Sequence, residues 1–440
     1  METNLPKKSH PKGLPVLFFT EMWERFSFYC MLSILALYMK ESLENGGLGF
    51  SIFKTGQIYG AYIGLVYFTP LLGGLIADRY LGIRRTIIIG GLFMMAGHFL
   101  LAFRPLPTFF AALACLMIGN GLFKPNISTM LGNLYRDIPA KKDDGYNIFY
   151  MGINLGAFMS PLVAASLRNL HPIHGWHYAF AAAGVGMIIS LITFLSFQKH
   201  VRAGESAAGA TDRVQEVVLT PQQARRRVQA LLVIFGVVVF FWMAFHQNGL
   251  TLTFWAENAT RTTLNPEIFQ SINPLFILMF TPLVVAFWNF MRMRRREPST
   301  ATKMSFGMLL TALAFTIMAV AGLSGGDTGR VSVWWLINAY AVITVGELLL
   351  SPMGLSLVSK LAPWKIRGLM MGGWFAATAV GNYLSGFLGS FWERMPHSTF
   401  FFILVVTSLF AAGILWALLR FLNPVIKEAE DMARKAAEAA

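Results

Sequence analysis

Long apolar runs alternate with short polar segments along most of the chain. Each run has about 20 residues, the length that an α-helix needs to cross the hydrocarbon core of a bilayer. The pattern predicts an all-α membrane protein with twelve transmembrane helices. The predicted spans lie near residues 17–39, 57–77, 86–103, 109–130, 148–168, 177–198, 229–252, 269–291, 304–323, 332–359, 367–391 and 400–421.

One polar segment is much longer than the others and divides the spans into two groups of six. It reads "RAGESAAGATDRVQEVVLTPQQARRR" and ends in a basic run. We expect four parts, with boundaries at 1–199 for an N-terminal six-helix bundle, 200–228 for a cytoplasmic linker, 229–423 for a C-terminal six-helix bundle and 424–440 for a cytoplasmic tail helix. Paired bundles around a central cavity are typical of secondary transporters.

The composition agrees with a polytopic membrane protein. Of 440 residues, 55% are hydrophobic and 13% are charged, whereas a soluble chain carries roughly 25% charged residues. The mean hydropathy is +0.55. Cys30 and Cys115 lie in apolar runs and indicate small buried side chains rather than a disulfide framework.

The net charge of +14 follows the loops. Basic residues cluster in alternate loops, for example Arg84 with Arg85 and the arginines at 294–296, and the loops between them carry one or two each. Basic loops stay in the cytoplasm during insertion. The distribution predicts that both termini are cytoplasmic, and it accounts for the positive charge without a nucleic-acid partner.

A faint internal repeat links spans four and ten, which contain "GNGLFKPNIS" and "GELLLSPMGLS". Aligning Pro125 with Pro352 superposes Asn120 on Glu347 and Lys124 on Ser351. Each proline removes a backbone hydrogen bond, so we expect a local break in both helices, which a polar cavity tolerates.

The loop after span two reads "GGLIADRYLGIRR" and resembles the G-x-x-x-D-R-x-G-x-R-R loop of the major facilitator superfamily. The resemblance implies the fold of that superfamily and a gate loop, formed by Asp78, Arg79, Arg84 and Arg85. Asp78 would hold the cytoplasmic ends of neighbouring helices through arginines and helix termini. The alternative is a solvated turn that only serves the topology.

Span one contains three ionised residues, Glu21, Glu24 and Arg25, and span four contains Lys124. Each charge costs about 2.5–3.5 kcal/mol at the centre of a membrane helix, so it should face a partner or a wet cavity. Glu21, Arg25 and Tyr29 recur every four residues and share one helix face. We therefore expect a balanced charge cluster, with Lys124 approaching from another helix.

Glu347 in span ten has no basic residue at a comparable depth. It could stay protonated and hydrogen-bond within its own bundle. It could also meet a cation that belongs to the substrate. Arg25 and Lys124 suit a carboxylate, so a zwitterion such as a short peptide would satisfy both sets of residues.

Several motifs resemble the proton-coupled oligopeptide transporter family, and they occur in the family's order. "EMWERF" at 21–26 matches its ExxERF motif, and "FYMGINLGAF" at 149–158 matches its FYxxINxG motif. "GLFKPN", "FQSINPLF", "GELLLSP" and "MMGGWF" also have counterparts there.

The resemblance implies import of di- and tripeptides, coupled to protons by alternating access. Arg25 and Lys124 would bind the peptide carboxylate, and Asn154, Asn273 and Glu347 its amino end. Glu21 and Glu24 would exchange protons while forming salt bridges with Arg25 and Lys124. Tyr29, Tyr67 and Trp374 would line side-chain pockets. Plain helix packing is the alternative for these aromatic residues, and interhelical hydrogen bonds are the alternative for the two asparagines.

Three positions depart from the family pattern: Phe28 replaces a tyrosine, Leu32 an arginine and His246 an acid. In the family the arginine and the acid form a salt bridge that closes the outer gate. Losing both is coherent, because losing one would strand a buried charge. The gate is then less polar, or it depends on His246. This histidine could be a satisfied core residue, a proton sensor or a substrate contact, and it keeps a carrier of nitrate or a modified amino acid open as the alternative.

Other functional classes fit less well. The chain has neither an HExxH zinc motif nor a convincing Ser/His/Asp arrangement, so we expect no enzyme, no metal and no cofactor other than the coupling proton. A receptor without transport would usually lose the coupling residues, which are all present. The short loops favour a compact bacterial carrier of the inner membrane. We expect it to function as a monomer.

Overall fold

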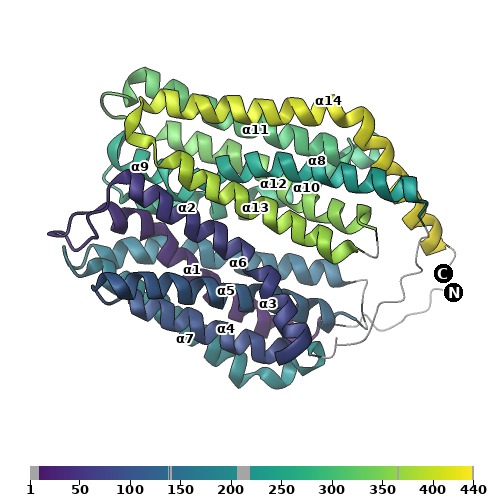
Figure 1. Cartoon of the computed structure of the whole chain (residues 1–440), viewed down its shortest axis with the longest axis horizontal. Helices are drawn as coiled ribbons and strands as arrows, with labels where there is room; N and C mark the ends of the chain where they lie inside the picture. Colours follow the sequence, from purple (N-terminus) through teal and green to yellow (C-terminus); the bar gives the residue numbers. More distant parts are fainter. Residues whose placement is uncertain (1–8, 137, 139–140, 206–218, 364–365, 439–440) are drawn as a thin grey trace. The chain divides into compact units, whose positions relative to one another are not determined.

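The computed structural model describes residues 9–136, 138, 141–205, 219–363 and 366–438. Within them the chain is almost entirely helical (Figure 1). Residues 206–218 of the predicted linker lie outside the described residues. The elements are α1 Gly13–Lys40, α2 Ile52–Phe68, α3 Pro70–Ile76, η1 Ala77–Leu81, α4 Ile83–Leu101, α5 Leu106–Leu134, α6 Lys142–Arg168, α7 Gly175–Ser196, η3 Gln198–His200, η4 Arg202–Gly204, α8 Pro221–Phe245, η5 His246–Gly249, α9 Thr251–Asn258, β1 Thr260–Arg261, η6 Pro266–Ser271, α10 Ile272–Met293, α11 Thr300–Ala321, η7 Gly322–Gly326, β2 Val331–Ser332, α12 Trp334–Leu361, α13 Arg367–Gly389, η9 Trp392–Arg394 and α14 His397–Glu438.

Ten helical segments of the described chain are long and apolar enough to cross a membrane. Helices α1 and α13, which correspond to predicted spans one and eleven, have 28 and 23 residues but are not among the ten. Helix α1 contains four charged residues, Glu21, Glu24, Arg25 and Lys40, which lower its hydropathy. The chain is thus a multi-pass membrane protein, and the number of twelve spans stays a prediction.

The described residues form two compact units that do not coincide with the two halves of the sequence. The first unit contains the residues up to 34 and those from 69 to the start of the linker. The second contains residues 35–68 and the described residues from 219 onward. Helix α1 contributes to both units, and α2 belongs to the second. The predicted division into bundles 1–199 and 229–423 remains a prediction.

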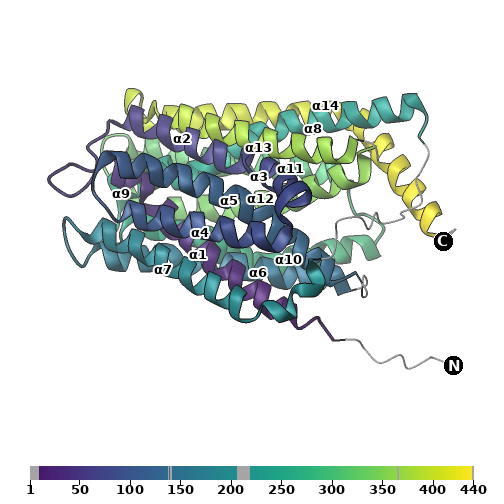
Figure 2. The ribbon, with the colours of Figure 1, turned by 60° about the horizontal axis from the view of Figure 1, so that its bottom comes forward.

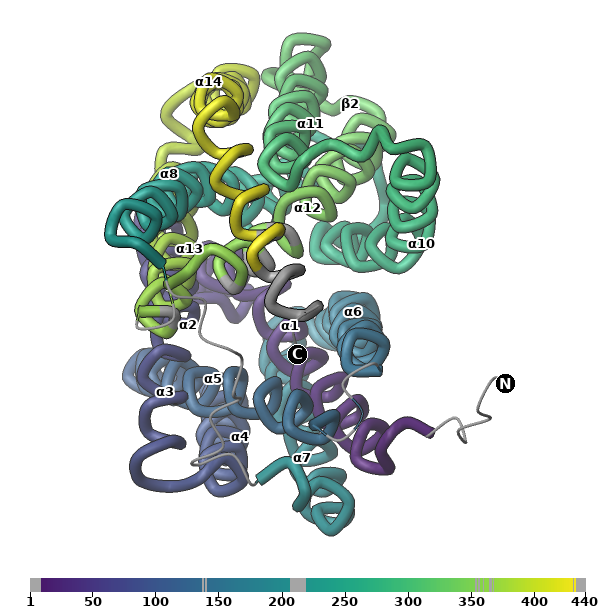
Figure 3. Tube along the Cα trace, turned by 90° about the vertical axis from the view of Figure 1, so that its right-hand side faces the viewer, coloured from purple at the N-terminus to yellow at the C-terminus, as the bar shows by residue number. Residues whose placement is uncertain are grey.

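In the first unit, α4 packs along both α5 and α7, and α3 packs on α5. The backbones of α4 and α5 approach closely, because a Cβ atom at Gly90 would lie 2.8 Å from the carbonyl oxygen of Gly119. Small residues at a helix contact allow this approach in membranes, where packing replaces the hydrophobic effect. Figure 3, viewed along the helices, shows α4, α5 and α7 grouped in this way.

In the second unit, α2 packs against α13, α11 lies against α12 and α14, and α8 lies against α13 and α14. Figures 1 and 2 both show α2 running beside α13. A Cβ atom at Gly60 would lie 2.8 Å from the Cα of Gly386, so the two backbones are in contact. Helix α14 continues through Pro424 and bends near its end (Figure 1), because proline removes one helical hydrogen bond.

Two predicted spans are interrupted. Predicted span seven consists of α8, the 3₁₀ turn η5 and α9, followed by β1, which pairs in parallel with β2. Predicted span two consists of α2, which ends at Phe68, and α3, which begins at Pro70. The breaks expected at Pro125 and Pro352 are absent from the described helices, since α5 and α12 continue through them.

Candidate functional site

The first unit contains a buried ion pair on α1. Arg25 donates through Nε to Glu24 Oε2 and through Nη2 to Oε1 over 2.6 Å, so the contact is bidentate. Glu24 is 0% exposed and Arg25 is 2% exposed. Two charges with so little access to water are stable in this place because each neutralises the other and fills its hydrogen bonds.

Three further residues surround this pair. Glu21, one turn before Arg25, has its Oε1 3.4 Å from Arg25 Nε. Arg25 Nη2 also donates to Asn120 Oδ1 on α5 over 3.2 Å. The guanidinium lies 5.0 Å from the ring centre of Phe28, which provides a cation–π contact where the family pattern has a tyrosine. The predicted charge cluster on span one therefore exists.

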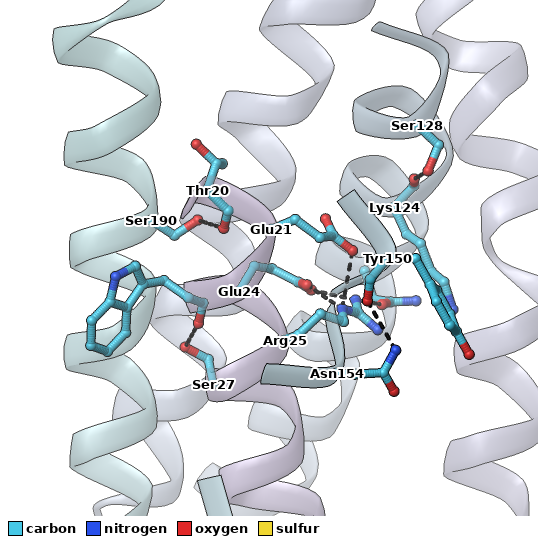
Figure 4. A network of polar contacts seen from close by, with 12 residues as sticks. Thr20, Glu21, Glu24, Arg25, Ser27, Lys124, Ser128, Tyr150, Asn154 and Ser190 are labelled. Carbon is cyan, nitrogen blue, oxygen red and sulfur yellow. Dashed lines mark hydrogen bonds and ion pairs between the residues drawn. The ribbon is translucent and has the colours of Figure 1, made fainter. Parts of the chain in front are cut away.

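Lys124 joins the cluster from α5. Its charge lies within electrostatic reach of Glu21, Glu24 and Arg25. Figure 4 shows Lys124 and Asn154 on the side of α1 to which the two carboxylates and Arg25 point. The amide of Asn154 donates to the carbonyl oxygen of Tyr150 over 2.9 Å, one turn back in α6. Tyr29 lies half-buried on α1, edge-on to Phe28.

The second unit contains the predicted isolated acid. Glu347 lies on α12 and is 9% exposed. Asn273, at the start of α10, donates from Nδ2 to Glu347 Oε2 over 2.9 Å and to Thr344 Oγ1 over 3.0 Å. Among the described residues Glu347 forms no ion pair. The structure thus brings together Asn273 and Glu347, which the resemblance assigns to the same end of the peptide, through a hydrogen bond between α10 and α12.

Three other predicted residues are also in the second unit. His246 lies in η5, and its ring centre is 5.7 Å from that of Tyr67 on α2 and 5.5 Å from that of Trp242. Trp374 on α13 is buried, and its ring covers Gly354 of α12 so closely that a Cβ atom would clash there. Tyr67 and His246 therefore share an aromatic group, whereas Trp374 fills a helix contact.

The residues of the predicted gate loop lie in η1, with Asp78 and Arg79, and in the first turn of α4, with Arg84 and Arg85. Asp78, Arg79 and Arg85 are exposed, and Asp78 forms no ion pair among the described residues. Arg84 instead binds the segment after α7, with Nε 2.6 Å from Glu205 Oε1 and with Nη1 donating to Gln198 over 3.0 Å. The start of the linker is thereby fastened to the first unit.

Sequence reasoning did not identify several contacts. Lys40 at the end of α1 forms an ion pair with Glu257 at the end of α9, and its ammonium lies 5.3 Å from the Phe254 ring centre. Asn120 accepts a hydrogen bond from Arg25, and Thr344 accepts one from the amide of Asn273. Only Asn120 had a signal, since the internal repeat aligns it with Glu347. The described residues contain no group of three His, Cys, Asp or Glu side chains that could hold a metal ion.

Comparisons with known proteins identify the family of the chain. The POT family profile matches residues 84–221 and 204–404. Peptide transporter YePEPT of Yersinia enterocolitica is 33% identical, over 86% of this chain and 88% of its own length. A di-/tripeptide transporter of Lactococcus lactis subsp. cremoris is 31% identical, over 96% and 97%.

A solved structure gives the same result for the fold. A mutant of peptide transporter POT in complex with alafosfalin superposes with a TM-score of 0.87 at 32% identity, covering 96% of this chain and 98% of that one. The family's members are transporters and not enzymes. The chain belongs to the POT family.

Proposed function

We propose that this protein is a proton-coupled symporter that imports di- and tripeptides by alternating access. Its relatives from Yersinia enterocolitica and Lactococcus lactis are named as peptide and di-/tripeptide transporters, and they align with nearly all of the chain. The coupling ion is the proton, and no other cofactor is required.

The observation that carries this proposal is the chemistry around Glu347. A buried carboxylate that has a neutral amide as its partner can accept a cation from outside the protein. A peptide brings such a cation at its amino end. We assign the amino end to Glu347, Asn154 and Asn273, and the carboxylate end to Arg25 and Lys124.

Proton coupling is assigned to Glu21, Glu24, Arg25, Lys124 and Glu347. Protonation of Glu21 or Glu24 would weaken its attraction to Arg25, which frees the guanidinium for the peptide carboxylate. Each proton that enters down an inside-negative potential contributes about 2.3 kcal/mol per 100 mV. That energy is sufficient for modest accumulation of a peptide.

The remaining predicted residues have supporting roles. Tyr29, Tyr67, His246 and Trp374 would contact peptide side chains, although the burial of Trp374 favours a role in packing. Asp78, Arg79, Arg84 and Arg85 would form the gate loop. The ion pair of Arg84 with Glu205 supports a role for this loop in holding the linker.

The proposed topology has twelve spans in two six-helix bundles, at 1–199 and 229–423, with the linker 200–228 and the tail 424–440 in the cytoplasm. The basic loops support cytoplasmic termini. We place the protein in the inner membrane of a bacterium, where it would function as a monomer.

The test is uptake into liposomes with an imposed pH gradient, offered dialanine, trialanine, free alanine and nitrate. We expect gradient-dependent uptake of both peptides and little of the other two. Nitrate or alanine uptake without peptide uptake would support the alternative, a carrier of nitrate or a modified amino acid.

A substitution addresses the role of Glu347. Glu347→Gln keeps an oxygen that accepts from Asn273, so the fold should be unchanged while peptide uptake falls at least tenfold. Glu393→Gln, an exposed acid in η9, is the control and should transport like the wild type. Wild-type uptake by Glu347→Gln would rule out the role at the amino end.

A further inference from the structure

One face of α12 carries three buried polar side chains, Tyr340, Thr344 and Glu347. Their spacing of four and three residues places them in a row along the helix. Tyr340 and Thr344 are 0% exposed. Buried polar groups find hydrogen-bond partners within the protein, so the partners identify which elements this row joins.

At the Glu347 end, the row is bonded to α10. Asn273 donates to Glu347 and to Thr344 through the same nitrogen, at 2.9 and 3.0 Å. Thr344 donates in turn to the carbonyl oxygen of Tyr340 over 2.7 Å. The bond to an ionised carboxylate is the stronger of the two bonds of Asn273, because charge assistance roughly doubles hydrogen-bond strength.

At the other end, the row is bonded to the break in predicted span seven. The Tyr340 hydroxyl donates to Asn248 Oδ1 over 2.6 Å. Asn248 belongs to η5, where the chain leaves the α-helical path of α8 before α9 begins. A 3₁₀ stretch within a long helix often marks a hinge.

The break is fixed by side chains as well as by its own backbone. Gln247, next to Asn248, is fully buried and donates to the carbonyl oxygen of Ser385 on α13 over 3.0 Å. Thr251 donates to Gln247 Oε1 over 2.8 Å. Because η5 is held by bonds to neighbouring helices, its position depends on where those helices lie.

We propose that Tyr340 and Asn248 are positioning residues that connect the state of Glu347 to the break in span seven. The inference rests on the proposed function of Glu347. When Glu347 becomes neutral, the bond from Asn273 loses its charge assistance and α12 is held less firmly to α10. The bond between Tyr340 and Asn248 persists, so a shift of α12 moves η5 with it.

Hydrogen exchange tests the connection without needing a substrate. Wild-type protein and three variants, Glu347→Gln, Tyr340→Phe and the double variant, are compared in lipid nanodiscs by mass spectrometry of peptides that cover residues 246–253. We expect Glu347→Gln to change exchange in this segment at least threefold. In the Tyr340→Phe background the same substitution should leave exchange unchanged. An equal change in both backgrounds, or no change in the wild-type background, would overturn the inference.

A matched control separates positioning from simple loss of a hydroxyl. Tyr146 donates to the carbonyl oxygen of Ser128 over 2.9 Å and belongs to the first unit, whereas this row belongs to the second. In the Tyr146→Phe background, Glu347→Gln should still alter exchange at 246–253. Asn248→Ala removes the other partner and should act as Tyr340→Phe does, which provides a second variant if Tyr340→Phe does not fold.

Uptake assays separate this inference from the proposed function. Altered exchange that depends on Tyr340, without peptide uptake by the wild type, would keep the connection and reject the peptide assignment. Peptide uptake by the wild type, together with hydrogen exchange that does not depend on Tyr340, would keep the peptide assignment and reject the connection. If the connection and the peptide assignment are both correct, gradient-driven peptide uptake by Tyr340→Phe should fall at least tenfold. Transport of external peptide against internal peptide, without a gradient, should fall less than threefold.

Discussion

The two buried acidic sites on α1 and α12 satisfy their charge in different ways. On α1, Glu24 and Arg25 neutralise each other through two hydrogen bonds, and Glu21 adds a second acid beside the same guanidinium. On α12, Glu347 has a neutral amide as its partner, and the described residues contain no ion pair for it. Both sites are almost fully buried.

The difference is that Glu24 is already paired with a charged partner, whereas Glu347 is bonded only to a neutral amide. Removing one member of a buried ion pair leaves the other charged and unpaired in a medium that solvates it poorly. An acid bonded to an amide can become neutral without leaving an opposite charge unpaired. Substitutions in the α1 cluster should therefore lower stability as well as transport, whereas substitutions of Glu347 should mainly affect transport.

The largest expected effect is on the α1 cluster. Arg25→Met should destabilise the fold by about 3–5 kcal/mol, because it strands the Glu24 carboxylate. Equilibrium unfolding in mixed micelles measures this loss. The double variant Arg25→Met/Glu24→Gln should recover most of it, and a single variant as stable as the wild type would break the comparison.

A smaller effect is expected at the amide of the second site. Asn273→Ala removes both hydrogen bonds to α12 and leaves Glu347 and Thr344 with fewer partners. We expect a loss of about 1–3 kcal/mol. In the Glu347→Gln background the loss should shrink, since a neutral side chain is easier to leave unpaired. The double-mutant cycle gives the coupling.

The ion pair of Lys40 with Glu257 tests whether burial determines how much an ion pair contributes to stability. It resembles the pair of Arg25 with Glu24 in charge, but its side chains are 18% and 26% exposed. Partial access to water should limit its contribution to about 1 kcal/mol. Lys40→Met is the test, and a loss as large as that of Arg25→Met would show that burial is not what distinguishes them.

The smallest effect is expected in the loop between α10 and α11. Arg292 donates to the carboxylate of Glu297 over 2.7 Å, and Lys303 donates to the same carboxylate over 2.6 Å. These bonds hold the pKa of Glu297 at about 2, below its usual 4.5. The stabilisation is therefore complete above pH 4.5 and disappears as the pH falls towards 2. Because Arg292 is mostly exposed, we expect less than about 1 kcal/mol.

Glu297→Gln is the variant that isolates this contribution. The stability difference between wild type and variant, measured at pH 7 and at pH 3, should narrow at the lower pH. A difference that stays constant between the two would contradict the assignment.

The sequence predicted the elements and chemistry that depend on local composition. Apolar length identified the helices, and the balance of acids and bases within the span predicted the cluster of Glu21, Glu24 and Arg25. The family motifs assigned Asn273 and Glu347 to the same end of the peptide, and the structure joins them by a hydrogen bond. These features could be read because they depend on helical geometry or on a known fold.

Other features depend on tertiary placement, and the sequence predicted them poorly. No proline marks the end of α8 at Phe245, so predicted span seven was continuous through 229–252. Lys40 and Glu257 lie at the ends of α1 and α9, and the sequence contains many other charged residues near helix ends. Nothing in the sequence indicates that these two form an ion pair. Gly56, Gly60 and Gly64 recur every four residues and indicate a close helix contact, but nothing in that spacing identifies α13 as the partner.

The contact of Gly60 with Gly386 also has a consequence for biosynthesis. Its two partners are 326 residues apart in the chain (386 − 60). At about 5–20 residues per second, translation of the intervening segment takes on the order of tens of seconds. During that time α2 must remain in the bilayer with its glycine face exposed to lipid or to insertion factors. A chain truncated before α13 should leave this face without its native cover, and such intermediates should be the ones that quality-control proteases remove.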